Sequence, residues 1–148
     1  MGRIVAINRS EKKGTVKTEI AEGRFIADYG LEGDAHAGKW HRQVSLLDYG
    51  SFLAFGREAK IPMNEGIFGE NLLVEGLDLS SVKVGDQLRS HDVLLEITQI
   101  GKECHKACEI RSIVGNCIMP TEGIFARVLE GGILRKGDEI CFVPSSSQ

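Results

Sequence analysis

Glycine is the residue that most limits how this chain can fold. Eighteen glycines among 148 residues interrupt the apolar runs every few positions. A glycine inside a helix costs about 1 kcal/mol relative to alanine, whereas a glycine between strands suits a tight turn. The pattern therefore predicts many short strands joined by turns, and it argues against a helical bundle.

Six apolar runs have the length and composition of strands, and two stretches favour helices. The strands are expected at 3–7, 44–47, 71–74, 93–99, 124–129 and 139–143. One helix is expected over FLAFGREAK, residues 52–60, with Ser51 as its cap. The other is expected over 104–114, where Ala107, Ile110 and Val114 recur at helical spacing.

Two short segments resemble each other and indicate how the strands are joined. They read KVGDQL, residues 83–88, and RKGDEI, residues 135–140. In each, glycine can take a positive φ and aspartate can bond its own turn before a strand begins. Repeated corners of this kind are typical of small barrels, which leave no strand edge exposed. We expect a mostly β fold, a small closed or partly closed β-barrel with a few short helices.

The composition narrows the classes of protein to which the chain can belong. A formal net charge of −3 without a basic stripe argues against a nucleic-acid partner. No apolar run approaches the roughly 20 residues that span a bilayer, and the first residues lack a signal-peptide core. We therefore expect a cytoplasmic protein that is not bound to a membrane. Its length fits a single domain over 1–144, with a disordered tail at 145–148.

A glycine-rich stretch before the second expected strand holds several ionisable groups. It reads GLEGDAHAGKWHRQVSLL, residues 30–47. Such a loop could gather Asp34, His36, Lys39, His41 and Arg42 around one opening. Arginine offers a planar fork of donors to a phosphate or carboxylate, so the pair His41-Arg42 is a candidate anion site. A solvated loop with a glycine turn is the alternative.

A second polar pair, Glu70-Asn71, stands at the start of the strand expected at 71–74. An Asx turn or a strand cap explains Asn71 without any ligand. From the spacing alone, the structural role is favoured.

The four cysteines leave three interpretations open. Cys104, His105, Cys108 and Cys117 offer zinc three sulfurs and an imidazole, but without two close pairs. Cys104 and Cys108 lie one helical turn apart and could form a dithiol switch. Alternatively, Cys104 is a single nucleophile, because Lys102, Lys106 and His105 favour its thiolate form.

The ordered set of these segments resembles a known family, the MOSC domain found at the C-terminus of molybdenum cofactor sulfurases. The segments are GLEGDAHAGKWHRQVSLL, FGENLLVEG, VGDQL, LEITQIGKECH and GIFARVLEGG. The resemblance runs from about Ile4 to Val143, and the chain is similar to the small stand-alone bacterial members of the family. It implies a compact β-barrel and a role in handling molybdenum cofactor or sulfur.

The resemblance also implies roles for individual residues. The family's signature cysteine corresponds to Cys104, whose thiolate would carry a sulfane sulfur as a persulfide or ligate molybdenum. His41 and Arg42 fall on the family's polar segment, and Asn71 falls on its GEN segment. We expect these three residues, together with Lys102 and His105, to bind the molybdopterin-type ligand.

This chain departs from the family pattern just before the cysteine. Many members carry a run with proline and arginine there, whereas this chain has IGKE, residues 100–103. Lys102 is then the candidate replacement for an arginine that holds the cofactor phosphate. No pyridoxal phosphate-binding lysine domain is evident, so a sulfur transferase of this kind would need a separate donor. The expected partners are a cysteine desulfurase or a molybdoenzyme.

Two other functions remain compatible with the residues. One is a structural or regulatory metal-binding module that uses the cysteines and His105. The other is a non-catalytic partner of cofactor-assembly enzymes.

Overall fold

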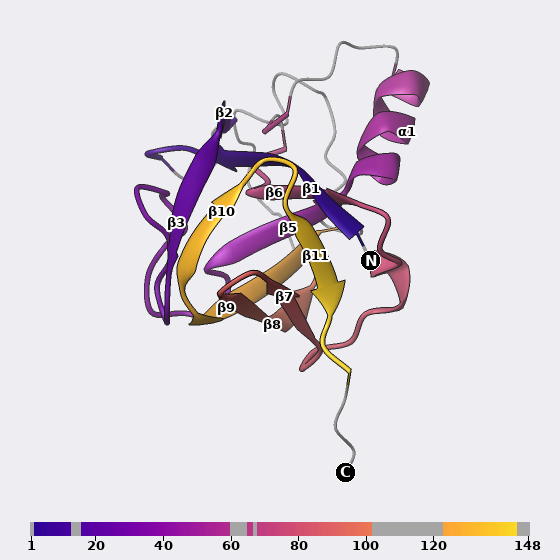
Figure 1. Ribbon diagram of the computed structural model, residues 1–148. Helices are drawn as coiled ribbons and strands as arrows, with labels where there is room; N and C mark the ends of the chain where they lie inside the picture. Colours follow the sequence, from indigo (N-terminus) through magenta and orange to yellow (C-terminus); the bar gives the residue numbers. More distant parts are fainter. Residues whose placement is uncertain (1, 13–15, 60–64, 67, 102–122, 145–148) are drawn as a thin grey trace.

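Seven strands close into a barrel in the computed structural model, which describes residues 2–12, 16–59, 65–66, 68–101 and 123–144 (Figure 1). The strands are β1 (Gly2–Arg9), β5 (Val44–Asp48), β6 (Leu72–Glu75), β7 (Gln87–Ser90), β8 (Val93–Ile100), β9 (Ile124–Glu130) and β11 (Glu139–Phe142). Their order is β11-β7-β8-β9-β5-β6-β1, and pairing of β11 with β1 completes the ring. Only β5 and β6 run parallel within this ring. The expected fold class, a small β-barrel, is confirmed.

Smaller elements surround the barrel. Strand β2 (Thr18–Ile20) extends the sheet beyond β1, and β10 (Gly132–Arg135), β3 (Glu22–Ile26) and β4 (Gly30–Leu31) form a separate three-stranded sheet. Helix α1 (Tyr49–Ala59) connects β5 to the segment before β6, and a short 3-10 helix, η1, covers Leu79–Ser81. Among the described residues, no helix is long and apolar enough to cross a membrane.

The core has two parts because neighbouring residues of a strand face opposite sides. Inside the barrel, Val44 and Leu46 of β5 pack with Leu72 and Val74 of β6. Outside it, the intervening side chains of these strands join a second cluster beneath α1. This cluster consists of Ala6, Leu47, Phe52, Phe68, Leu73 and Phe125. The helix therefore covers one outer face of the barrel.

The two Gly-Asp corners have the expected geometry. Gly85 and Gly137 both adopt left-handed backbone conformations, with φ of 100° and 95°. Asp86 accepts a hydrogen bond from the backbone N–H of Lys83 at 2.9 Å, and Asp138 accepts one from that of Arg135 at 2.7 Å. The strands that follow these corners, β7 and β11, pair with each other. The two repeated segments thus have the same turn geometry and lead into two neighbouring strands of the barrel wall.

All six expected strands are present, and their ends differ by one or two residues. The cap assigned to Ser51 is wrong. Helix α1 begins at Tyr49, and the carboxylate of Asp48 accepts the backbone N–H of Ser51 at 3.0 Å. Strands β2, β3, β4 and β10 were not expected, because short segments with exposed charges and glycines carry little strand signal. The second helix, at 104–114, lies outside the described residues.

We predict that Phe52→Ala destabilises the protein by about 3–5 kcal/mol, the usual cost of removing a buried aromatic ring. Phe52 is 1% exposed and packs edge-to-face on Phe68, with 5.9 Å between ring centroids. The neighbouring Leu53→Ala is the control, because Leu53 is 38% exposed. Urea unfolding of both variants measures the difference. Equal losses would show that the second cluster does not anchor the helix.

Candidate functional site

Arg42 presents a guanidinium held by aromatic rings rather than by acceptors. Its Cζ lies 4.7 Å from the ring centroid of Trp40 and 5.7 Å from that of Phe125. The Nε atom is buried without a hydrogen-bond partner, and the side chain forms no hydrogen bond or ion pair with the described residues. Aromatic faces attract a cation without using its N–H groups. The donor fork of Arg42 therefore remains available to an anion.

His41, the neighbour of Arg42, is tied to the end of β8. Its Nε2 atom donates to Oε1 of Gln99 at 2.8 Å, and its backbone carbonyl accepts the hydroxyl of Thr98. Gln99 in turn donates to the carbonyl of Gly101 at 2.7 Å. His41 and Arg42 thus stand where β5 begins and β8 ends. The pair named from the sequence is held at one end of the barrel wall.

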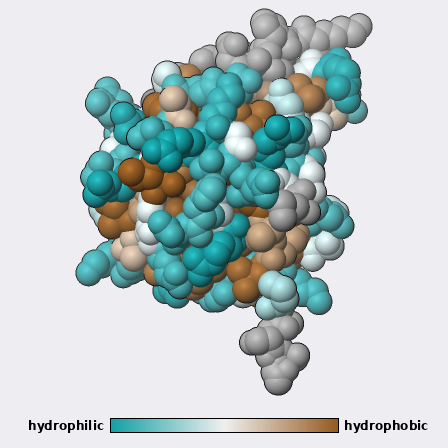
Figure 2. Space-filling view, in the orientation of Figure 1, coloured by the Kyte–Doolittle hydropathy of each residue, from teal (hydrophilic) through white to brown (hydrophobic). Residues whose placement is uncertain are grey.

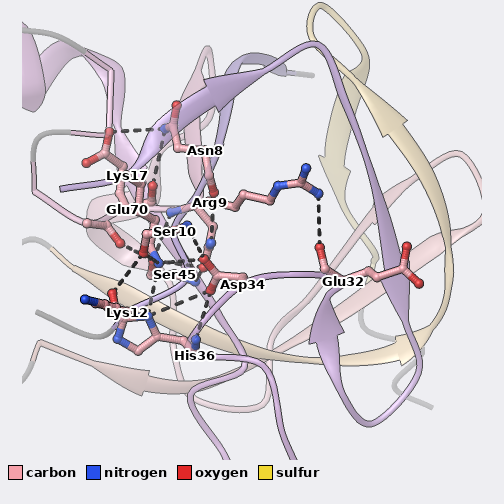
Figure 3. Close-up of polar contacts among 12 residues, drawn as sticks. Asn8, Arg9, Ser10, Lys12, Lys17, Glu32, Asp34, His36, Ser45 and Glu70 are labelled. Carbon is pink, nitrogen blue, oxygen red and sulfur yellow. Dashed lines mark hydrogen bonds and ion pairs between the residues drawn. The ribbon is translucent and has the colours of Figure 1, made fainter. Parts of the chain in front are cut away.

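Asp34 does not line an opening, contrary to the expectation from the sequence. Its side chain is fully buried and lies 2.7 Å from Nζ of Lys17, whose side chain is also fully buried (Figure 3). The backbone N–H groups of Ser10 and His36 donate to the carboxylate at 3.0 and 3.1 Å. These hydrogen bonds offset part of the cost of burying two charges. The burial of Lys17 could not be predicted from the sequence, because lysine is seldom buried.

This buried pair connects to Arg42 through two side chains. The Nδ1 atom of His36 lies 3.1 Å from Nζ of Lys17, which can only donate, so Nδ1 is the acceptor. Trp40 donates from Nε1 to the His36 carbonyl at 2.7 Å, and its ring stacks parallel to that of His36. Arg42 then packs on Trp40. These contacts hold the loop of residues 34–42 in place through Lys17. Lys39, in the same loop, is exposed.

Glu70 is a second buried acid close to this cluster (Figure 3). Its carboxylate accepts backbone N–H groups of Gly66 at 2.6 Å and Phe68 at 3.0 Å, and the side-chain amide of Asn8 at 3.4 Å. Burial raises the pKa of the Glu70 carboxyl to about 7, although these backbone hydrogen bonds and the charge of Lys17 lower it in part. The Glu70 carboxyl is therefore about half protonated near neutral pH.

Both the oxygen and the nitrogen of the Asn71 side-chain amide form hydrogen bonds within the fold. Its Oδ1 atom accepts the backbone N–H of Ser45 at 2.9 Å and the Ser45 hydroxyl at 3.2 Å. Its Nδ2 atom donates to the carbonyl of Asn8 at 3.0 Å. Asn71 is completely buried, and these contacts agree with the structural role favoured by the spacing. Its role as a cofactor ligand stays a prediction.

The remaining candidate residues, Lys102, Cys104 and His105, lie outside the described residues. The chain reaches this segment from Gly101 and returns at Gly123, and the N–H of Gly101 donates to the carbonyl of Gly123 at 2.7 Å. Among the described residues, no group of three or more histidine, cysteine, aspartate or glutamate side chains is arranged to hold a metal ion.

Solved structures share this architecture. The YUAD protein from Bacillus subtilis superposes with a TM-score of 0.77 at 20% identity, over 95% of this chain and 94% of that one. YiiM from Geobacillus stearothermophilus also gives a TM-score of 0.77 at 20% identity, over 99% of this chain and 77% of that one. The fold is thus a barrel already seen in other bacterial proteins.

The MOSC domain model matches residues 33–141, which include the loop with Arg42 and most of the barrel. This chain therefore belongs to the MOSC domain family, which is associated with molybdenum cofactor sulfurases. A curated relative, Protein YiiM of Escherichia coli (strain K12), is 28% identical in an alignment of 115 residues that covers 71% of this chain. The match spans about half the length of that relative, 50%.

We predict that the stability conferred by Glu70 depends on pH. Its pKa is raised from 4.5 to about 7 in the folded state, so this group stabilises the fold below pH 4.5 and loses that contribution as the pH rises through 7. The full change is on the order of 3 kcal/mol, at about 1.4 kcal/mol per pKa unit. The free energy of unfolding of the wild type should therefore fall between pH 5 and pH 8 relative to that of Glu70→Gln.

Urea unfolding at several pH values measures this difference. Glu58→Gln on the exposed side of α1 is the control, and its pH profile should follow that of the wild type. Parallel profiles for the wild type and Glu70→Gln would contradict the assignment.

Proposed function

We propose that this chain binds a molybdopterin-type ligand and carries sulfur on the thiolate of Cys104. The observation that carries the proposal is the guanidinium of Arg42, which packs against Trp40 and Phe125 and has no acceptor among the described residues. Membership of the MOSC family supports it independently, because that family is associated with molybdenum cofactor sulfurases.

The chemistry of Arg42 fits the phosphate of such a ligand. A planar guanidinium can donate two parallel charge-assisted hydrogen bonds to a phosphate, which a lysine cannot do. The ring of His41, held by Gln99, lies beside it and adds a partly exposed polar edge. In this proposal Arg42 binds the phosphate, His41 orients the ligand, and Lys102 and His105 contribute from the segment after β8. When bound, the cofactor would supply a molybdenum atom, which a soft thiolate such as that of Cys104 suits as a ligand.

The short chain distance between Gly101 and Cys104 supports a role for Cys104 at the same end of the barrel as His41 and Arg42. Cys104 is the third residue after Gly101, and three residue steps along the chain reach at most about 11 Å. Gly101 accepts the side-chain amide of Gln99, the partner of His41. A thiol at position 104 is therefore within range of a ligand that extends from Arg42 along the end of β8.

Sulfur transfer needs only persulfide exchange. The Cys104 thiolate attacks the terminal sulfur of a donor persulfide, which forms Cys104–S–S⁻ and releases the donor thiolate. A nucleophilic acceptor then takes the terminal sulfur, and the Cys104 thiolate is restored. In this proposal the donor is a cysteine desulfurase and the acceptor is a molybdoenzyme.

We predict that Cys104 is the most reactive cysteine near neutral pH, because its sequence neighbours carry the most positive charge. Limiting iodoacetamide followed by peptide mapping measures the order of labelling. Native mass of the untagged protein completes the test, since a sulfur carrier shows an increment of one sulfur. Preferential labelling of Cys117 or the half-buried Cys141, or bound zinc at one atom per chain, would contradict the proposal.

We predict that Arg42→Gln weakens binding of molybdopterin or a phosphopterin by roughly ten- to a hundredfold. Hydrogen bonds to charged groups contribute about 1.5–3 kcal/mol each, and about 1.4 kcal/mol is a factor of ten. The affinity of Arg42→Lys should lie between those of the wild type and Arg42→Gln, because lysine retains the charge but not the planar fork of donors. Titration of each variant with the same ligand measures the affinity.

Two controls accompany this titration. Arg57→Gln changes an exposed arginine on α1 and should bind as the wild type does. The melting temperature and the Cys104 labelling of Arg42→Gln should be unchanged, because the two groups hold opposite ends of the ligand. Equal affinities of the wild type and Arg42→Gln would remove Arg42 from the site.

A further inference from the structure

A cavity lies at the end of the β8–β9 pair that is opposite to His41 and Arg42. It has a volume of about 740 Å³, within the usual range for small-molecule sites, and lies between the β3–β10 strands and the turn at His91-Asp92. Asp92 and Thr98 are six residues apart along β8, which corresponds to about 20 Å at 3.3 Å per residue. The cavity is therefore separate from the site at His41 and Arg42.

One wall of this cavity carries two arginines on the same face of the small sheet. Arg24 of β3 pairs in register with Ile133 of β10, and Arg135 pairs with Glu22. All four side chains are exposed, whereas Gly23 and Leu134, the paired residues between them, are buried. Diagonal neighbours on adjacent strands lie about 7–8 Å apart, within reach of long side chains. Arg24 and Arg135 can therefore close on a single anion.

Both arginines have donors to spare. Arg24 forms no hydrogen bond or ion pair with the described residues, and Arg135 uses only Nε, at 3.2 Å from the Glu22 carboxylate. The Arg135 and Glu22 side chains are 62% and 54% exposed, so water screens this pair and it binds weakly. The terminal nitrogens of both guanidinium groups are available to a ligand.

The opposite wall supplies an acceptor. The Oδ2 atom of Asp138 accepts the backbone N–H of Arg135 at 2.7 Å, and its Oδ1 atom lies 3.5 Å from Nε2 of His91. Both carboxylate oxygens of Asp138 therefore already have partners within the protein. Asp92 is exposed and forms no hydrogen bond or ion pair with the described residues, so its carboxylate can accept a hydrogen bond from a ligand.

Glycine keeps the floor of the cavity free of side chains. A Cβ atom on Gly131 would lie 2.5 Å from the carbonyl oxygen of Phe25, and one on Gly132 would lie 3.0 Å from Cβ of Asp92. The turn between β9 and β10 can therefore approach both walls only because these positions lack side chains. The face of the protein in Figure 2 is mainly hydrophilic with separate hydrophobic islands. Ile133, which is 40% exposed, gives the cavity an apolar edge.

We propose that this cavity binds a small organic anion, with Arg24 and Arg135 holding a carboxylate or phosphate group and Asp92 accepting a hydroxyl or amino group of the same molecule. Charge-assisted bonds from two arginines give the affinity, and the acidic residue selects against simple anions that lack a donor. The site is independent of the function proposed for Arg42 and Cys104.

Two matched probes test the proposal on the full chain at fixed ionic strength. Citrate carries three carboxylates and a hydroxyl group, and tricarballylate carries the same carboxylates without the hydroxyl group. Inorganic phosphate is the third probe and separates phosphate from carboxylate recognition. Amide NMR shifts of Gly131, Gly132 and His91 should saturate with citrate at a lower concentration than with tricarballylate.

Four variants complete the experiment. Arg24→Gln and Arg135→Gln should each weaken citrate binding about tenfold or more, whereas Arg57→Gln on α1 should leave it unchanged. Asp92→Asn should reduce the preference for citrate over tricarballylate. Tighter binding of phosphate than of citrate would support the site with phosphate as its anion. Failure of citrate and phosphate to saturate the shifts, or equal losses in all three arginine variants, would overturn the proposal.

Discussion

The pairing of β1 with β11 is the constraint on which the rest of the structure depends. It joins Arg3 to Glu139 and Gly2 to Ile140 across almost the full length of the chain and turns an open sheet into a ring. Closure removes the exposed edges of the strands in the ring and gives each an inner and an outer face. Both hydrophobic clusters follow from this division, since alternate residues of β5 and β6 fill the interior and the space beneath α1.

Barrel closure also decides which loops meet. Strand β9 lies between β5 and β8, so the start of β5 stands beside the end of β8, and His41 can reach Gln99. The segment that contains Cys104 begins directly after this point. At the other end of the β8–β9 pair, the same strands bring the β7–β8 turn beside β10. One strand pair therefore separates two polar regions by its own length.

A buried ion pair controls the loop that carries the candidate anion site. Lys17 and Asp34 are both inaccessible to solvent, and their contacts continue through His36 and Trp40 to Arg42. Removing one partner of such a pair leaves an uncompensated buried charge, which is strongly destabilising. The position of Arg42 is thus linked to a buried cluster, and we expect substitutions at Lys17 or Asp34 to act on the site through the loop.

The sequence by itself determined the repeated local features of this protein. Six strands and both Gly-Asp corners could be predicted because side-chain alternation and turn chemistry depend on neighbours in the chain. The family could also be recognised, because the order of its segments is written in the sequence. His41 and Arg42 could be named as a polar pair because they are adjacent in the sequence and belong to one of these family segments.

Only the tertiary structure decided which polar groups are buried and which are available. Asp34 and Arg42 belong to the same glycine-rich stretch, yet Asp34 turns inward to Lys17, whereas Arg42 forms no hydrogen bond or ion pair with the part of the chain that the structure describes. Strands β3 and β10 carry weak signals of their own and are stabilised by pairing across more than a hundred residues. Burial and long-range pairing depend on which distant residues meet when the barrel closes, and local sequence patterns do not contain that information.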